Sequence, residues 1–162
     1  MGIGLAISFE LDYFFIPLSP PQNLTDVEIK LERTACFGSS LIYSITVFGD
    51  GTVMYEGKQF VQVEGIRIYS IPKESVDELI GRFYEKNYFS LKNRYDVSVT
   101  DLPTVITSIK IKNETKSVSN YADAGPDRLH DLELKIDEIT DSQSLWEIEL
   151  PNSAQNYLRA IF

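Results

Sequence analysis

The chain has 162 residues, a formal net charge of −9, one cysteine and one histidine. This length corresponds to one domain, which can bury more than half of its unfolded surface and needs no disulfide to fold. Binding to phosphates requires clustered Lys and Arg, so the acidic balance argues against nucleic acid and against an anionic membrane surface as partners. The single cysteine, Cys36, excludes an intramolecular disulfide and a multi-cysteine zinc site.

Residues 1–26 are expected to form an N-terminal extension. Met1 to Phe9 is apolar, but no basic residue precedes it and Glu10 and Asp12 follow it, so we expect neither a signal peptide nor a membrane span. A cytoplasmic location is therefore favoured. Residues 11–18 carry apolar side chains that would be costly in water. We expect this segment to be ordered, either by adding to the sheet or by packing on a second copy in a homodimer.

A run of strands is expected to begin at Val27, where apolar and polar residues start to alternate strictly. Gly49-Asp50-Gly51 predicts a tight turn, because Asp and Gly tolerate positive φ. The stretch over 34–40 between the first two strands is irregular. The strands expected in this first run cover residues 27–32, 43–47, 52–55, 57–65 and 66–69.

The period of the apolar residues changes to that of a helix after Pro72, and again after Pro126. Between these helices, residues 91–100 indicate a loop with a possible strand remnant, and a second hairpin turns at Asn113-Glu114, between strands over 105–111 and 116–119. The buried stripe of the first helix, which fades near Asn87, is expected at Val76, Leu79, Ile80, Phe83 and Tyr84; that of the second is expected at Leu129, Leu132, Ile136 and Ile139. Trp146, Ile148 and Leu150 indicate a short strand or an extended arm, and 153–162 a terminal helix.

Strands followed by a helix thus occur twice. This order predicts an α+β domain, in which an antiparallel sheet is built from two hairpin-plus-helix units and the helices pack on one face. We expect the core domain to cover residues 27–140. The remaining residues, 141–162, are expected to form a C-terminal extension that packs on this core.

Two segments resemble an uncharacterised bacterial and archaeal family, the domain of unknown function six-four-three-eight. The first joins Leu31-Glu32-Arg33-Thr34-Ala35-Cys36-Phe37-Gly38-Ser39 and Tyr43 to Phe48-Gly49-Asp50-Gly51-Thr52-Val53; the second is Thr100-Asp101-Leu102-Pro103-Thr104 with Tyr121. The resemblance covers about residues 27–140 and implies no established activity. The family motif runs Cys-Phe-Gly-x-Cys-Pro, whereas this chain has Ser40 and Leu41 at the last two positions. A dithiol role of that loop is therefore absent here.

The loop from Arg33 to Tyr43 is the first candidate site. In a functional interpretation Arg33 anchors an anion, and Cys36 with the amides of residues 38–40 forms a small cradle. In a structural interpretation Arg33 pairs with an acid, Cys36 is a small buried apolar residue and Gly38 supplies a turn. Five tyrosines either line a groove or form core and cross-strand contacts: Tyr43, Tyr55, Tyr69, Tyr95 and Tyr121.

Cys36 and Asp101 are the candidate reactive groups. A nucleophilic Cys36 would need a nearby base, but the only histidine, His130, falls on the second predicted helix, where a surface or boundary position is expected. Asp101 is a candidate general acid, general base or metal ligand, with Asp96 as a second carboxylate. Its spacing matches no known metal loop, and the simpler interpretation is a side chain that caps a turn before Pro103.

Two functions remain open. The preferred one is a non-catalytic binding or interaction module that holds a protein or a small ligand at its sheet face or at the Cys36 loop, with no cofactor and no metal. Its basis is the absence of a triad, a phosphate loop or metal-ligand spacing, together with the common use of such sheets for binding. The alternative is a small enzyme whose acid–base site combines Arg33, Asp101 and Tyr121.

Overall fold

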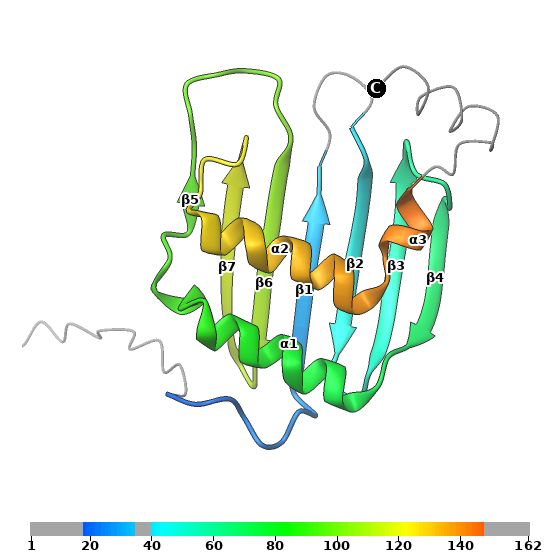
Figure 1. The fold of residues 1–162 in the computed structure, drawn as a ribbon, viewed down its shortest axis with the longest axis vertical. Helices are drawn as coiled ribbons and strands as arrows, with labels where there is room; N and C mark the ends of the chain where they lie inside the picture. Colours follow the sequence, from blue (N-terminus) through cyan, green and yellow to red (C-terminus); the bar gives the residue numbers. More distant parts are fainter. Residues whose placement is uncertain (1–17, 35–39, 148–162) are drawn as a thin grey trace, which may run out of the picture.

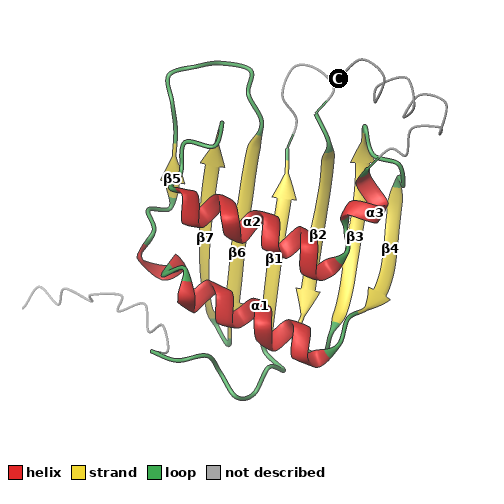
Figure 2. Ribbon diagram, viewed as in Figure 1, coloured by secondary structure: helices red, strands yellow, loops and turns green. Residues whose placement is uncertain are grey.

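Seven strands form one mostly antiparallel sheet in the computed structural model, which describes residues 18–34 and 40–147 (Figures 1 and 2). The order across the sheet is β4-β3-β2-β1-β6-β7-β5. Only the short β5 pairs in parallel, with β7. The strands are β1 (Val27–Arg33), β2 (Ile42–Phe48), β3 (Thr52–Gln59), β4 (Gly65–Ser70), β5 (Arg94–Tyr95), β6 (Thr104–Ile111) and β7 (Glu114–Tyr121).

Strand β1 lies at the centre because it pairs with β2 on one side and with β6 on the other. Its Val27, Ile29 and Leu31 are buried, whereas the residues between them are only partly buried. This is the alternation that the sequence predicts for a strand with one covered face. The order of elements, four strands before α1 and three before α2, places both halves of the chain in one sheet.

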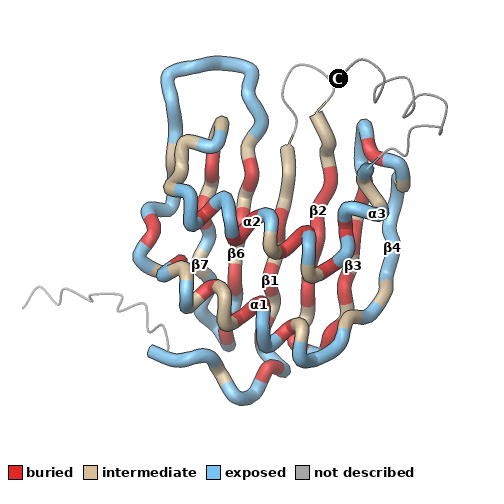
Figure 3. The backbone as a smooth tube through the Cα atoms, viewed as in Figure 1, coloured by how far each residue is buried: buried red, intermediate tan, exposed pale blue. Residues whose placement is uncertain are grey.

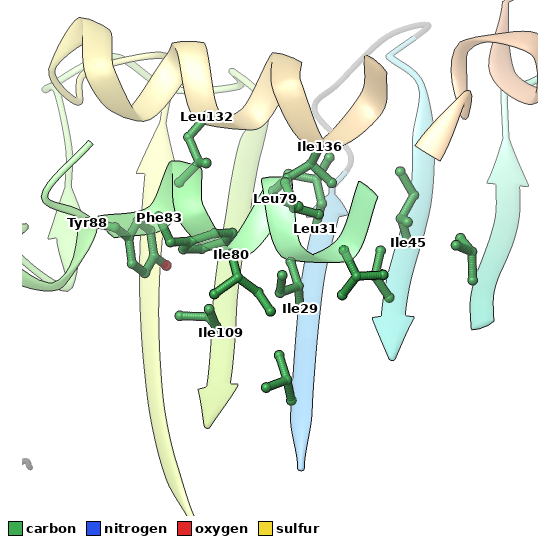
Figure 4. Close-up of a cluster of buried hydrophobic side chains, with 14 of the residues drawn as sticks. Ile29, Leu31, Ile45, Leu79, Ile80, Phe83, Tyr88, Ile109, Leu132 and Ile136 are labelled. Carbon is green, nitrogen blue, oxygen red and sulfur yellow. The ribbon is translucent and has the colours of Figure 1, made fainter. Parts of the chain in front are cut away.

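The helices α1 (Lys73–Glu85) and α2 (Asp127–Thr140) cross the same face of the sheet (Figure 1). Between them, the 3-10 turn η1 (Tyr88–Ser90) contributes the buried ring of Tyr88, and after α2 comes the short α3 (Gln143–Trp146). The apolar stripes of both helices meet the inward-facing strand residues and form one core (Figure 4). In Figure 3 the buried stretches lie on the two long helices and on the inner strands, whereas β4 remains largely exposed.

The turn between β2 and β3 needs its two glycines for different reasons. Gly51 has φ of +92°, a conformation that favours glycine, and its N–H donates to the carbonyl of Phe48 at 3.0 Å. Gly49 is required by space instead, because a Cβ at this position would lie 1.6 Å from the backbone oxygen of Leu24. Asp50 Oδ1 accepts from the N–H of Thr52 at 2.8 Å, which closes the turn.

Two predictions are wrong at residues that the structure describes. Residues 60–63 do not belong to a strand: β3 ends at Gln59, and the chain bends at Phe60, whose φ is +57°. Val61 is buried in the core and Val63 packs against it from this bend, so the apolar residues repeat with the period of a strand although no strand is formed. Trp146 lies in α3 and not in a strand or arm, and it packs against the core. Ile148, Leu150 and 153–162 lie outside the described residues.

The segment before β1 is partly attached to the domain. Leu24 is buried in the core, and its carbonyl accepts from the N–H of Val27. Leu18 is fully exposed, and residues 11–17 lie outside the described residues, so ordering or dimerisation through 11–18 stays a prediction. None of the helices in the described part of the chain is long and apolar enough to cross a membrane.

The contact between Gly49 and Leu24 gives a matched pair of variants. Gly49→Ala should lower the free energy of unfolding by about 2–4 kcal/mol, because the new Cβ meets backbone that has to move. Gly81→Ala is the control, since its Cβ meets nothing within 4 Å on α1. It should raise stability by about 0.5–1 kcal/mol through helix propensity. Urea unfolding of both variants measures the difference, and an unaffected Gly49→Ala protein would contradict this packing.

Candidate functional site

Helix α2 buries acidic side chains against the sheet beside its apolar stripe. Glu133 and Asp137 are 1% and 5% exposed, although they stand four residues apart among leucines and isoleucines. Acidic residues are almost never buried this fully without a partner. Each of the two carboxylates is held by a different group of side chains, and these two clusters are the polar centres beneath α2.

The first, the Arg33 cluster, comprises Arg33, Tyr43, Asp137 and Ser142. Arg33 donates from Nη2 to Asp137 Oδ2 at 2.8 Å and from Nε to the hydroxyl of Tyr43 at 2.7 Å. Tyr43 donates to Asp137 Oδ1 at 2.9 Å, and Ser142 donates to the same oxygen at 2.6 Å. The carboxylate therefore accepts three hydrogen bonds, one of them from a cation.

The surroundings of Arg33 and Tyr43 keep both side chains protonated. Burial alone would lower the pKa of Arg33, but the contacts with Tyr43 and Asp137 raise it above its ordinary value. Burial, reinforced by the negative charge of Asp137, raises the pKa of Tyr43 far above its usual range. Arg33 therefore stays charged and Tyr43 stays a neutral donor, so neither of these two side chains is poised to act as an acid or a base. Trp146 stacks on the ring of Tyr43 with ring centroids 6.0 Å apart.

The second, the Glu133 cluster, comprises Asn120, Asp123, His130 and Glu133. Asn120 Nδ2 donates to the carboxylate of Glu133 at 3.1 and 3.4 Å, and Asn120 Oδ1 accepts from the N–H of Gly125 at 2.8 Å. The Nδ1 atom of His130 lies 3.9 Å from Glu133 Oε2 and 3.7 Å from Asp123 Oδ1. Burial raises the pKa of Glu133 to about 7, despite the hydrogen bond from Asn120.

The candidate residues predicted from sequence are distributed over separate places. Arg33 and Tyr43 face each other at the adjoining ends of β1 and β2 and meet in the Arg33 cluster. Tyr121 instead holds the β5–β6 loop, where its hydroxyl donates to the carbonyl of Val99 at 2.6 Å and accepts from the N–H of Leu102 at 3.2 Å. Asp101 is an exposed residue of that loop.

The backbone of Asp101 has φ of +66°, a conformation in which Asp is tolerated better than most residues. This geometry fits the turn interpretation of Asp101, and among the described residues no hydrogen bond or ion pair joins it to Arg33. Cys36 and the cradle at 38–39 lie outside the described residues, so their role stays a prediction. The sequence interpretation missed Glu133 and Asp137, since neither differs in type from the exposed acids of α2.

A sheet edge that no other described strand pairs with is the third notable feature. Strand β4 ends the sheet, and its Ile66 and Ile68 are 56% and 70% exposed on the face that the helices leave open. Beside it lies a hollow of about 440 Å³ between β4 and the end of α2, lined by Arg67, Tyr69, Ile71, Thr140, Asp141 and Leu145, among others. The opposite edge, β5, has only two residues. The long apolar edge is thus the one that is open to pairing.

The chain belongs to the family described as Domain of unknown function (DUF6438), whose profile matches residues 27–140. The family resemblance predicted from the sequence is confirmed by this match. A comparison with curated proteins found no match. The description of this family names no activity.

The Arg33 cluster should contribute strongly to stability. Asp137→Ala removes the acceptor of a largely buried guanidinium and should lower the free energy of unfolding by about 3 kcal/mol. Tyr43→Phe, which removes one hydroxyl, should cost about 1 kcal/mol, and the double variant should show coupling between the two. Denaturant unfolding measures all three. Glu85→Ala, which breaks an exposed ion pair with Arg82, serves as the control and should change stability little.

Glu133 should make the protein less stable as the pH rises. Its pKa is raised from 4.5 to about 7 by folding, so the folded state binds more protons between these values and stability falls as the pH rises through them. Glu133→Gln should remove this dependence of stability on pH. Above pH 7 its free energy of unfolding should be higher than that of the wild type by roughly 1–3 kcal/mol. The charges of Arg33, Asp123 and Asp137 also act on the pKa of Glu133, so these three residues must be left unchanged in the variants compared.

The measurement is thermal or urea unfolding from pH 4 to 8 in EDTA, which removes any metal ion. Glu138→Gln is the control, because it alters an exposed carboxylate of the same helix. If the stability of the wild type and of Glu133→Gln changed with pH in the same way, burial would not raise the pKa of the Glu133 carboxyl as described above.

Proposed function

We propose that this member of the family is a non-catalytic binding module that takes up an extended segment of another protein along the free edge of β4. The observation that carries the proposal is the six-residue terminal strand with exposed Ile66 and Ile68. Edge strands are usually protected from pairing with another chain because they are short, charged or covered. Addition of a partner strand to such an edge is a common mode of peptide recognition.

The two faces of β4 indicate what the bound segment looks like. Ile66 and Ile68 point to the open face, where Ile68 pairs with Met54 of β3. Arg67 and Tyr69 point to the helix face, toward the hollow beside α2 and α3. A strand that pairs with β4 would place alternate side chains over these two surfaces. Apolar side chains at alternate positions of the partner fit both.

Charge selects further among such segments. Asp141 follows the last residue of α2 and lines the hollow, and the C-terminal end of a helix carries a partial negative charge. The whole chain has a net charge of −9. A basic residue on the side of the partner that faces the hollow would therefore be favoured, although Arg67 lies at the same surface. The proposed ligand is an extended segment with alternating apolar residues and a net positive charge.

This proposal assigns a task to each half of the domain. If the chain is built from two hairpin-plus-helix units, the first unit supplies the edge strand β4. The second unit supplies the wall of the hollow, which includes Thr140 at the end of α2. The hydroxyl of Tyr69 on β4 donates a hydrogen bond to the carbonyl of Thr140 at 2.7 Å. That hydrogen bond holds the end of α2 at a fixed position over β4, so the groove is formed before a ligand binds.

The test is selection of peptides from a phage-displayed library of random linear sequences, followed by titration of the selected synthetic peptides with the full chain. Enriched peptides should carry alternating apolar residues with Lys or Arg, and Ile68→Lys should weaken their binding by about tenfold or more. Leu134→Lys is the matched control, since Leu134 is a comparably exposed apolar residue on the outer side of α2.

Four results would overturn the proposal. The first is a selection without enrichment, and the second is equal binding by Ile68→Lys and the wild type. The third is a wild type that is dimeric in solution and becomes monomeric with Ile68→Lys, because β4 would then be occupied by a second copy of this chain. Binding that appears only after residues 148–162 are removed would likewise assign the edge to the chain's own tail.

A further inference from the structure

The Glu133 cluster is not used by the proposed binding of a peptide at β4. It lies where the connector after β7 meets the first half of α2, and it gathers one imidazole and two carboxylates. One ligand atom from each of Asp123, His130 and Glu133 lies within 4.8 Å of the other two. Two of these residues are three apart on one helix, and the third comes from the connector before that helix.

Glu133 has an unusual environment for a carboxylate. It is 1% exposed, and the donor that reaches it within hydrogen-bonding distance in the described part of the chain is the neutral amide of Asn120. A carboxylate has about four lone-pair positions. Its Oε2 atom, which receives only the longer of the two contacts, is the atom that lies toward His130 Nδ1. A buried negative charge of this kind is stabilised by a cation.

We propose that Asp123, His130 and Glu133 bind a divalent transition-metal ion, for which Zn²⁺ is the appropriate probe. Zn²⁺ accepts imidazole nitrogen together with carboxylate oxygen and commonly uses three protein ligands with water in the remaining position. Bonds of about 2.1 Å place tetrahedral ligand atoms about 3.4 Å apart. The separations of 3.7 and 3.9 Å at His130 Nδ1 approach this value, and all three ligand atoms lie within 4.8 Å of one another, so binding requires the side chains to move closer together.

The surroundings fit a metal site in two further respects. Asn120 orients the carboxylate of Glu133 and is itself held by the N–H of Gly125, which is the arrangement by which outer residues position metal ligands. The side chains of His130 and Asp123 are 49% and 66% exposed, so water reaches the remaining coordination positions. A bound ion would join the connector to α2 on the exposed side, through Asp123 and His130. On the buried side Asn120 already joins them through its hydrogen bonds with Gly125 and Glu133.

The experiment is calorimetric titration of the full, chelator-treated chain with Zn²⁺, with Mg²⁺ as a second probe. The wild type should bind one Zn²⁺. Asp123→Asn, an exposed change that leaves the core untouched, and His130→Gln should each weaken binding by about tenfold or more. Mg²⁺ should bind far more weakly, because hard cations prefer oxygen ligands to imidazole.

Two matched variants separate this site from other ligands on the chain. Cys36→Ser removes the only thiol, and Asp131→Asn removes an adjacent carboxylate of α2 that pairs with Lys86. Both should bind Zn²⁺ like the wild type. His130 is the only histidine, so its imidazole resonances report directly on the site, and Zn²⁺ should shift the Nδ1 signal.

The proposal is overturned by any of three results: no Zn²⁺ binding by the wild type, full binding by both Asp123→Asn and His130→Gln, or binding that is lost in Cys36→Ser. Unchanged imidazole resonances in a protein that binds Zn²⁺ would also overturn it. None of these results depends on peptide binding at β4, so the two proposals fail separately.

Discussion

The ion pair between Arg33 and Asp137 connects the central strand to the helix that covers it. Arg33 is the last residue of β1, which pairs with strands on both sides, and Asp137 belongs to the last turns of α2. The pair is largely buried, so neither charge can return to water while the helix stays in place. Tyr43 and Ser142 donate to the same carboxylate, which ties β2 and the start of α3 to the same point. The position of α2 over the sheet is therefore set by directional bonds as well as by apolar packing.

This fixed position has a consequence for the opposite side of the molecule. Both long helices occupy one face, and the seven strands leave the other face uncovered within the described residues (Figure 1). Much of that face is polar and carries the Lys30–Glu32 and Lys58–Glu56 ion pairs. Its apolar part is concentrated at β4, where Ile66 and Ile68 are exposed. An exposed apolar patch beside a polar face is typical of interaction sites, which is the basis of the proposal for β4.

Periodicity predicted the sheet strands and both long helices because it reports which side of an element faces the core. Periodicity failed where an apolar residue packs against the core from a bend or a short helix and not from a regular strand. Val61 enters the core from a bend, and Trp146 stacks on Tyr43 from a short helix; both contacts depend on distant residues and leave no local pattern. Arg33 and Tyr43 were predicted only as candidate residues at the two ends of one loop, and the strand register brings them opposite each other. Their acidic partner could not be identified, because α2 contains several acids and only the packed structure shows which one faces inward.

Glu133 and Asp137 show how far burial alone determines chemistry. They stand one helical turn apart on α2, face the same sheet and are almost equally buried. Asp137 accepts hydrogen bonds from a guanidinium and from two hydroxyl groups, so its carboxylate is paired within the chain. Glu133 receives one amide, so its charge is left to be balanced by a proton or by an ion from solution. The same degree of desolvation thus produces a structural anchor at one position and an adaptable group at the other. The difference comes from the strand residue opposite each: Arg33 on the central strand, and Asn120 on β7.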